Sequence, residues 1–288
     1  MSQAVARAGL RREVLDLSGE STPIRALLSD LWRRRGLITM LAARDFNARY
    51  RSAALGVLWS AAIPLLQAIV LSIVFTKLVR IPVGGVSYPV FILSGTVMWS
   101  FFSTSVNAGA TVIVDQGQIA GKVYFPRLIL SIVPPLANSV SFALSMLVLL
   151  PVMLVAGADL RPTLLLLPLA MLLMLVLVIL IGSLTTLAHV YFRDMRYLVQ
   201  AALLVLMYGT PVIYPLEVTL RPNVNPVFHW LLLANPATGP LVLARWCVFG
   251  RGAYVPVAVA STLAWCLVLL VGALLAYRRH ERVAVDRL

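Results

Sequence analysis

The sequence predicts an all-α polytopic membrane protein with six transmembrane helices. Hydrophobic residues make up 60% of the 288 residues and charged residues only 12%, whereas roughly a quarter of a soluble domain is charged. Six apolar stretches, each close to the ~20 residues that cross a hydrocarbon core, lie between residues 57 and 277. Almost all arginines lie outside these stretches, at the chain ends and in short loops.

The region before the first apolar stretch divides into two parts. Residues 1–24 are polar and mixed in charge, which predicts a flexible cytosolic leader. In residues 25–56, apolar side chains recur at helical spacing while arginines occupy the other positions. Such an amphipathic segment carries too much charge to cross a bilayer but can lie in the headgroup plane. We therefore expect an interfacial helix here; a helix packed on a partner protein is the alternative.

The transmembrane domain is expected to extend over residues 57–277. Its predicted spans are about 57–79, 89–114, 128–156, 163–190, 198–214 and 255–277. The fifth span is only just long enough to cross. Residues 278–288 form the predicted cytosolic tail.

The orientation follows from the basic residues. The segment through Arg51 holds ten arginines, and basic residues also occur after the second span, after the fourth span and in the tail. In a six-span topology all four regions lie on one side of the membrane. The excess of arginine and lysine in cytoplasmic loops makes that side cytoplasmic, with both termini on it. This explanation of the formal charge of +13 is favoured over nucleic-acid binding.

The cytoplasmic loop at about 115–125 is short and polar, and we expect a helical turn there that docks in a groove of a soluble motor protein. Its sequence GQIAGKV resembles a phosphate-binding loop. However, only three residues separate the glycines, and Val123 stands where a serine or threonine would hold magnesium. A nucleotide site in this loop is therefore excluded.

The segment at about 214–249 contains apolar pieces that prolines interrupt, and neither piece is long enough to span. Short broken helices of this kind are tolerated at membrane depth only where protein or a water-filled cavity covers their free backbone groups. We expect re-entrant or interfacial helices that form a gate on the outer face. An ordinary structured outer loop is the alternative.

Catalytic chemistry is absent from the sequence. No protease, esterase or metal-binding motif occurs, and His189, His229 and His280 fall in separate regions of the topology. Cys247 and Cys266 form no metal or redox motif. No charged residue occupies the middle of a span, which argues against an ion-driven carrier. If the chain transports a substrate, its energy is expected from another subunit.

Several short motifs together resemble those of type-2 ABC exporter permeases. They occur in the family's order and cover about residues 25–285. The motifs are Arg44-Asp-Phe-Asn-Ala-Arg-Tyr50, Leu55-Gly-Val-Leu-Trp59 with Pro64, Phe125-Pro-Arg127, Phe192-Arg-Asp194, Thr210-Pro-Val-Ile-Tyr214 and Asn235-Pro-Ala-Thr-Gly239. Within the family, the pattern looks most like permeases that export lipid-linked polysaccharides such as O-antigen, teichoic acid, capsule or galactan.

The resemblance implies a homodimer in a bacterial cytoplasmic membrane that exports a lipid-linked glycan. It also implies two copies of a separate ATP-binding subunit, which would hold ATP and magnesium, and no cofactor in this chain. The residues expected to contact the ATPase are Gln118, Ile119 and Lys122. Those expected to brace the chain where it enters the membrane are Arg44, Asp45, Arg49 and Tyr50.

The resemblance also implies a channel between the two copies, lined by the first and fifth spans. Trp59, Tyr208 and Tyr214 are the candidate aromatics for contact with sugar rings. Anchoring in the membrane interface or packing in the core explains each of them equally well. Two other functions stay open: the same fold exporting a drug or other small amphipathic molecule, and an integral membrane enzyme of glycan or lipid assembly.

Overall fold

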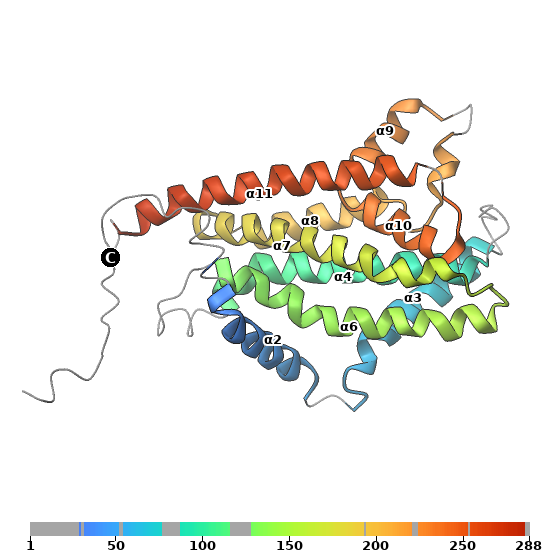
Figure 1. The fold of residues 1–288 in the computed structure, drawn as a ribbon, viewed down its shortest axis with the longest axis horizontal. Helices are drawn as coiled ribbons and strands as arrows, with labels where there is room; N and C mark the ends of the chain where they lie inside the picture. The colour runs from blue at the N-terminus through green and yellow to red at the C-terminus, as the bar shows by residue number, and fades with distance from the viewer. Residues whose placement is uncertain are drawn as a thin grey trace, which may run out of the picture.

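The computed structural model describes residues 29, 32–51, 54–76, 87–115, 128–192, 194–220, 224–252 and 254–285. Within these ranges every regular element is a helix and no strand occurs, which confirms the all-α class. The long helices lie roughly alongside one another in an elongated bundle (Figure 1). The predicted leader and the predicted ATPase contacts Gln118, Ile119 and Lys122 lie outside the described residues.

Eleven elements follow one another along the described chain. They are α2 (Arg35–Tyr50), α3 (Leu58–Val74), α4 (Tyr88–Asp115), α6 (Leu128–Val155), η3 (Pro162–Leu166), α7 (Leu167–Tyr191), α8 (Met195–Tyr208), η4 (Leu216–Leu220), α9 (Pro226–Ala234), α10 (Thr238–Phe249) and α11 (Val255–Val285).

Each of the six predicted spans contains a helix, but the helices differ in length. Among the described residues, four are long and apolar enough to cross a membrane: α4, α6, α7 with η3, and α11. The pair α9 and α10, bent by 92°, counts as a fifth if it forms one broken span. Helices α3 and α8 have only 17 and 14 residues. The exact number of six crossings therefore stays a prediction.

Two of the predicted boundaries differ from the helix ends by six residues or more. Helix α8 ends at Tyr208, six residues before the predicted end of the fifth span. The reason is local: Gly209 follows Tyr208, and Pro211 lacks a backbone N–H and disfavours helical geometry in the residue before it, Thr210. At the other boundary, the backbone of α11 stays helical through Val285, past the predicted end at 277.

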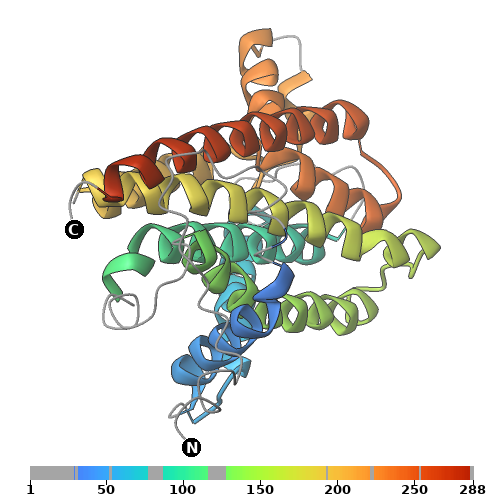
Figure 2. The ribbon, with the colours of Figure 1, turned by 60° about the vertical axis from the view of Figure 1, so that its left-hand side comes forward.

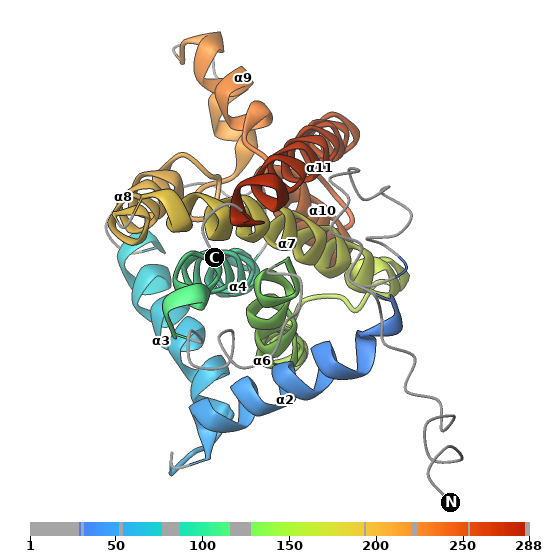
Figure 3. The same cartoon turned by 90° about the vertical axis from the view of Figure 1, so that its left-hand side faces the viewer.

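Helix α4 occupies the centre of the bundle. Viewed along the bundle, α3, α6, α7 and α8 surround it (Figure 3). Of its most apolar window, 78% is buried, against 22% for the corresponding windows of α7 and α11. The buried side chains of α4 include the polar residues Ser94, Thr96 and Ser105. Polar side chains of a membrane helix belong inside the bundle, where they find hydrogen-bond partners.

Two elements extend from opposite sides of this bundle. Helix α2 crosses beneath α6. On the far side, α9 projects beside α11 (Figure 2); α9 and α10 together are called the hairpin below. In Figure 1, α2 lies near the end of the bundle where α11 finishes, whereas α9 and α10 lie near the end where α11 begins. The two elements thus mark the two ends of the bundle.

Close packing of α10 against α11 depends on one glycine. A Cβ atom at Gly239 would lie 2.2 Å from the hydroxyl oxygen of Thr262 and 2.5 Å from the carbonyl oxygen of Ala258. Contacts this short do not occur, so the helix backbones can approach only because residue 239 has no side chain.

Candidate functional site

Two clusters of polar side chains hold the elements at the two ends of the bundle. The first, the α2–α6 cluster, consists of Asp45, Arg49, Tyr50, Ser105, Asn138 and Ser141. The second, the α8-end cluster, consists of Tyr88, Thr210, Asn235 and Arg245 with the carbonyl groups of residues 209–214.

In the α2–α6 cluster, the last turn of α2 is bonded to α6. A guanidinium nitrogen of Arg49 donates a 2.5 Å hydrogen bond to the side-chain oxygen of Asn138, and another lies 2.7 Å from the Asp45 carboxylate. The Tyr50 hydroxyl lies 3.0 Å from the hydroxyl of Ser141. Three of the four residues predicted to brace the membrane entry thus come together, while Arg44 is exposed.

Helix α6 supplies its partners from a single polar stripe that sequence reasoning missed. Ser131, Asn138, Ser141 and Ser145 follow one another at spacings of seven, three and four residues, so they share one face of the helix. Their helical spacing within a largely apolar segment was the available signal. Through these residues α6 is hydrogen-bonded to four helices. Asn138 and Ser141 bind α2, and Asn138 also binds Ser105 of α4 (3.0 Å). Ser131 binds Ser183 of α7 (3.0 Å), and Ser145 binds the Ser60 carbonyl of α3 (3.2 Å).

The α8-end cluster surrounds a stretch of non-helical backbone. After Tyr208 the backbone no longer continues the helix. Side chains of other elements donate to the carbonyl groups of residue 209 and of residues 211–214, whereas that of Thr210 accepts from the backbone N–H of Val212. Asn235 reaches the carbonyl oxygen of Gly209 (2.8 Å), and the Tyr88 hydroxyl reaches that of Ile213 (3.0 Å). Non-helical backbone within an apolar bundle requires such partners.

Arg245 supplies the remaining donors of this cluster. It comes from the middle of α10, is only 6% exposed, and donates to the carbonyl oxygens of Pro211 and Val212. Its guanidinium carbon also lies 3.6 Å from the centre of the Phe91 ring on α4. Sequence reasoning placed this residue within the outer segment and gave it no role, although a lone arginine in an apolar run was a signal.

The break between α9 and α10 belongs to the same cluster. Besides binding Gly209, the Asn235 amide donates to the Thr210 hydroxyl (2.9 Å), and its oxygen accepts from the backbone N–H of Ala237 (3.0 Å). On α11, Thr262 donates to the Pro236 carbonyl (2.8 Å) and the Trp265 ring to that of Ala234 (2.6 Å). The break is therefore bonded both to the end of α8 and to α11.

The structure separates the three candidate channel aromatics into two places. Trp59 is 43% exposed in the first turn of α3, and Tyr208 is 66% exposed at the end of α8. Tyr214 is partly buried and donates its hydroxyl to the Tyr208 carbonyl (2.9 Å). The far end of α3 lies nearest to the α8-end cluster, because Phe75 stacks on Tyr88. Trp59 lies instead at the start of α3, next to Ser60, whose carbonyl oxygen accepts a hydrogen bond from Ser145 in the middle of α6.

Comparison with known proteins assigns this arrangement to a family. Residues 36–249, from α2 through α10, match the family described as ABC-2 type transporter. The chain belongs to this family.

Its relatives include O-antigen export system permeases. The O-antigen export system permease protein RfbA of Myxococcus xanthus is 34% identical over 195 residues, which cover 66% of this chain and 73% of the relative. Two proteins of the same name from Klebsiella pneumoniae are 26% and 25% identical, and in each case the match covers 73% of this chain and 78% of the relative. This ABC-2 transporter chain is therefore a type-2 ABC permease, a multi-pass membrane subunit whose family implies an ATP-binding partner subunit.

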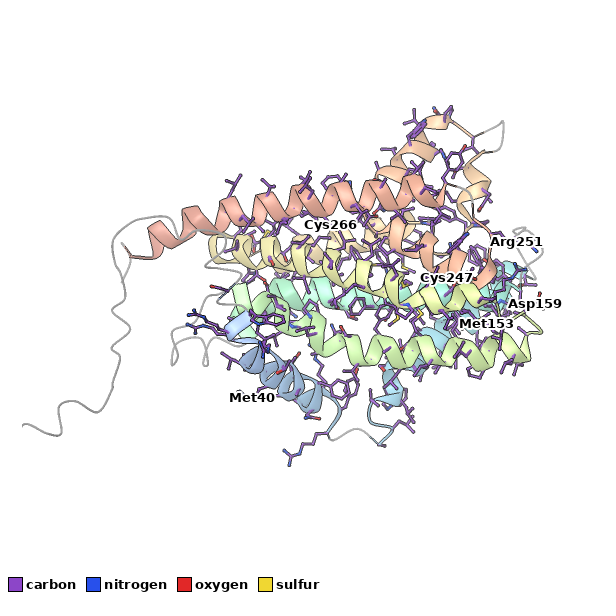
Figure 4. The ribbon with its side chains drawn as sticks, in the orientation of Figure 1. Met40, Met153, Asp159, Cys247, Arg251 and Cys266 are labelled. Atoms are coloured by element: carbon purple, nitrogen blue, oxygen red, sulfur yellow. The ribbon has the colours of Figure 1, made fainter. Side chains whose placement is uncertain are left out.

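The remaining reactive side chains of the permease are dispersed. Among the described residues, no three His, Cys, Asp or Glu side chains are grouped so that they could hold a metal ion. Cys247 on α10 and Cys266 on α11 are free and buried at separate positions in the bundle (Figure 4). His229 is buried on α9, where a ring nitrogen lies 2.8 Å from the Thr219 hydroxyl. What the two clusters of this permease can do is hold helices in register.

Proposed function

We propose that this chain is the membrane-spanning subunit of an ATP-driven exporter that moves a lipid-linked polysaccharide from the cytoplasm across the bacterial inner membrane. The observation that carries the proposal is the 34% identity to an O-antigen export permease, which extends over nearly three quarters of that protein. The family match over residues 36–249 includes α2 and both polar clusters, so it covers the parts of the fold that would bind and pass a substrate.

In this proposal ATP and magnesium bind to two copies of a separate ATP-binding subunit. Gln118, Ile119 and Lys122 contact that subunit from the loop that follows the end of α4 at Asp115. The central position of α4 supports this assignment, because α4 packs against α3, α6, α7, α8 and α10. A displacement at its end would be passed to most of the bundle.

The channel is formed with a second copy of the chain. Helices α3 and α8 pack on α4 and lie on one side of the bundle (Figure 3). Both present exposed apolar side chains, such as Ile63 and Val70 on α3 and Leu204 and Val205 on α8. Exposed surfaces of this kind mark interaction sites or lipid contact. Trp59, Tyr208 and Tyr214 lie on or beside these helices, where aromatic faces would contact sugar rings.

At the cytoplasmic face, the lipid carrier passes beside α2. The cationic residues of this helix, including Arg44 and Arg49, suit the anionic headgroup of such a carrier. The α2–α6 cluster keeps the helix on the bundle, so Asp45, Arg49 and Tyr50 brace the place where substrate and carrier enter.

Depletion of the chain in its own organism tests the proposal. We expect lipid-linked polymer to accumulate inside the cells and surface polymer to fall, and expression of the wild-type chain to restore both. Surface polymer that stays normal, together with increased sensitivity to drugs, would contradict the proposal and favour export of a small amphipathic molecule.

A further inference from the structure

The charge of Arg245 is the least expected feature of the outer hairpin. Ten of the twelve residues of α10 are buried, and Arg245 is among them at 6% exposure. Burial of a cation is unfavourable unless polar partners replace its water shell. The partners of this side chain therefore indicate why it is there.

Those partners come from three different segments. The guanidinium donates to the carbonyl oxygens of Pro211 and Val212, and a third carbonyl, that of Tyr214, lies 3.5 Å away. The planar cation also lies over the Phe91 ring of α4. The carboxylate of Glu217 on η4 adds an electrostatic attraction. One side chain thus joins α10 to the unwound end of α8 and to α4.

The space around the guanidinium requires a second special residue. A Cβ atom at Gly95 on α4 would lie 2.6 Å from the Val212 carbonyl oxygen and 2.7 Å from a terminal nitrogen of Arg245. Any larger residue at position 95 would push apart the two groups that the hydrogen bond joins. Substitution of either Gly95 or Arg245 should therefore disrupt the same contact.

We propose that Arg245 is a positioning residue of the outer gate: it clamps α10 to the unwound end of α8, so that the hairpin and the exit end of α8 move as one unit. This proposal rests on the proposed function only for the identity of the transported substrate. Without Arg245 the carbonyl groups of Pro211 and Val212 lose their donors, and water is the remaining partner. The turn at 210–214 then opens.

The shape of the side chain predicts how well lysine can replace it. Arginine presents several N–H donors in a rigid plane, whereas lysine carries a compact ammonium on a flexible stem. An Arg245→Lys chain keeps the charge but cannot hold both carbonyl groups in the same geometry or cover the Phe91 ring in the same way. It should therefore restore the clamp only partly.

Cysteine labelling in permeabilised membranes tests the clamp without any transport assay. In a full-length chain with Cys247→Ala and Cys266→Ala, Val212→Cys reports on the clamped turn and Val178→Cys on the core of α7; both positions have 0% exposure. Arg245→Met should raise the rate at which a water-soluble maleimide labels position 212 at least tenfold. Arg245→Lys should give an intermediate rate, and position 178 should stay protected throughout.

Three results would overturn the proposal. One is unchanged labelling at position 212 in the Arg245→Met chain. Another is equal acceleration at position 178, because Arg245 would then stabilise the whole fold instead of the turn. The third is a Gly95→Ala chain that folds but leaves position 212 protected, since its added methyl group should break the same contact. Confirmed labelling without polymer accumulation on depletion would instead refute the proposed substrate and leave the clamp standing.

Discussion

Asn138 accepts a hydrogen bond from Arg49 of α2 and donates one to Ser105 of α4, so a single amide on α6 connects three helices. The sequence indicated the α2 side of this contact through the motif that contains Arg49 and Tyr50. The partners of Arg49 and Tyr50 on α6 lie 89 and 91 residues further along the chain. Nothing in the local pattern pairs residues so far apart, which is why Asn138 and Ser141 were missed.

Replacement of Asn138 by leucine should lower the stability of the permease. Leucine fills a similar volume but leaves Arg49 and Ser105 without this partner. Hydrogen bonds between membrane helices contribute modestly, so we expect a loss of about 1–2 kcal/mol in the free energy of unfolding. Thermal unfolding in lipid nanodiscs measures it. Asn47→Leu, at an exposed position of α2, is the matched control; equal effects of the two changes would refute the role of the cluster.

At the scale of elements, the proline-rich segment between residues 211 and 240 illustrates what local signals can predict. The prolines indicated that helices break here, and the structure places α9 and α10 at 92°, with the break between Ala234 and Thr238. The early end of α8 was not predicted, because the apolar run continues through the turn. Arg245 and Asn235 stabilise that turn from a distance in sequence of 25–34 residues.

The contact between α10 and α11 gives a prediction for this hairpin. Gly239→Ala places a methyl group against the backbone of Ala258, so the helices must separate. We expect a loss of about 1–3 kcal/mol, measured by thermal unfolding. Gly36→Ala is the control: no atom lies within 4 Å of its added methyl group, and alanine is favoured over glycine in a helix. A Gly239→Ala chain as stable as the control would show that the close approach is unimportant.

The loop between α4 and α6 gives a second prediction at this scale. We expect Ile119→Glu combined with Lys122→Glu to abolish transport and weaken co-purification of the ATP-binding subunit, because the changes replace an apolar contact and reverse a charge. The amount of chain in the membrane and its thermal stability should not change. Arg282→Glu, a charge reversal in the predicted cytosolic tail, is the control. Unchanged transport in the double variant would remove the coupling role of this loop.

At the scale of the whole molecule, composition was sufficient for the class but not for the arrangement. The abundance of apolar residues and the placement of arginines predicted helices within a membrane, and the described chain is all helical. Ordinary hydropathy does not reveal which helix is central. Helix α4 is the least apolar of the four long helices and yet the most buried, because lipid offers no partners to serine and threonine while neighbouring helices do.

The central claim is that this permease supplies the gated path and a separate subunit supplies the energy. Reconstitution into vesicles with and without the ATP-binding subunit tests it most directly, with translocation of a labelled lipid-linked glycan as the measured quantity. The account predicts no ATP hydrolysis and no uphill movement with the permease alone, and ATP-dependent translocation with both subunits. Uphill movement or ATP hydrolysis by the permease alone would contradict it.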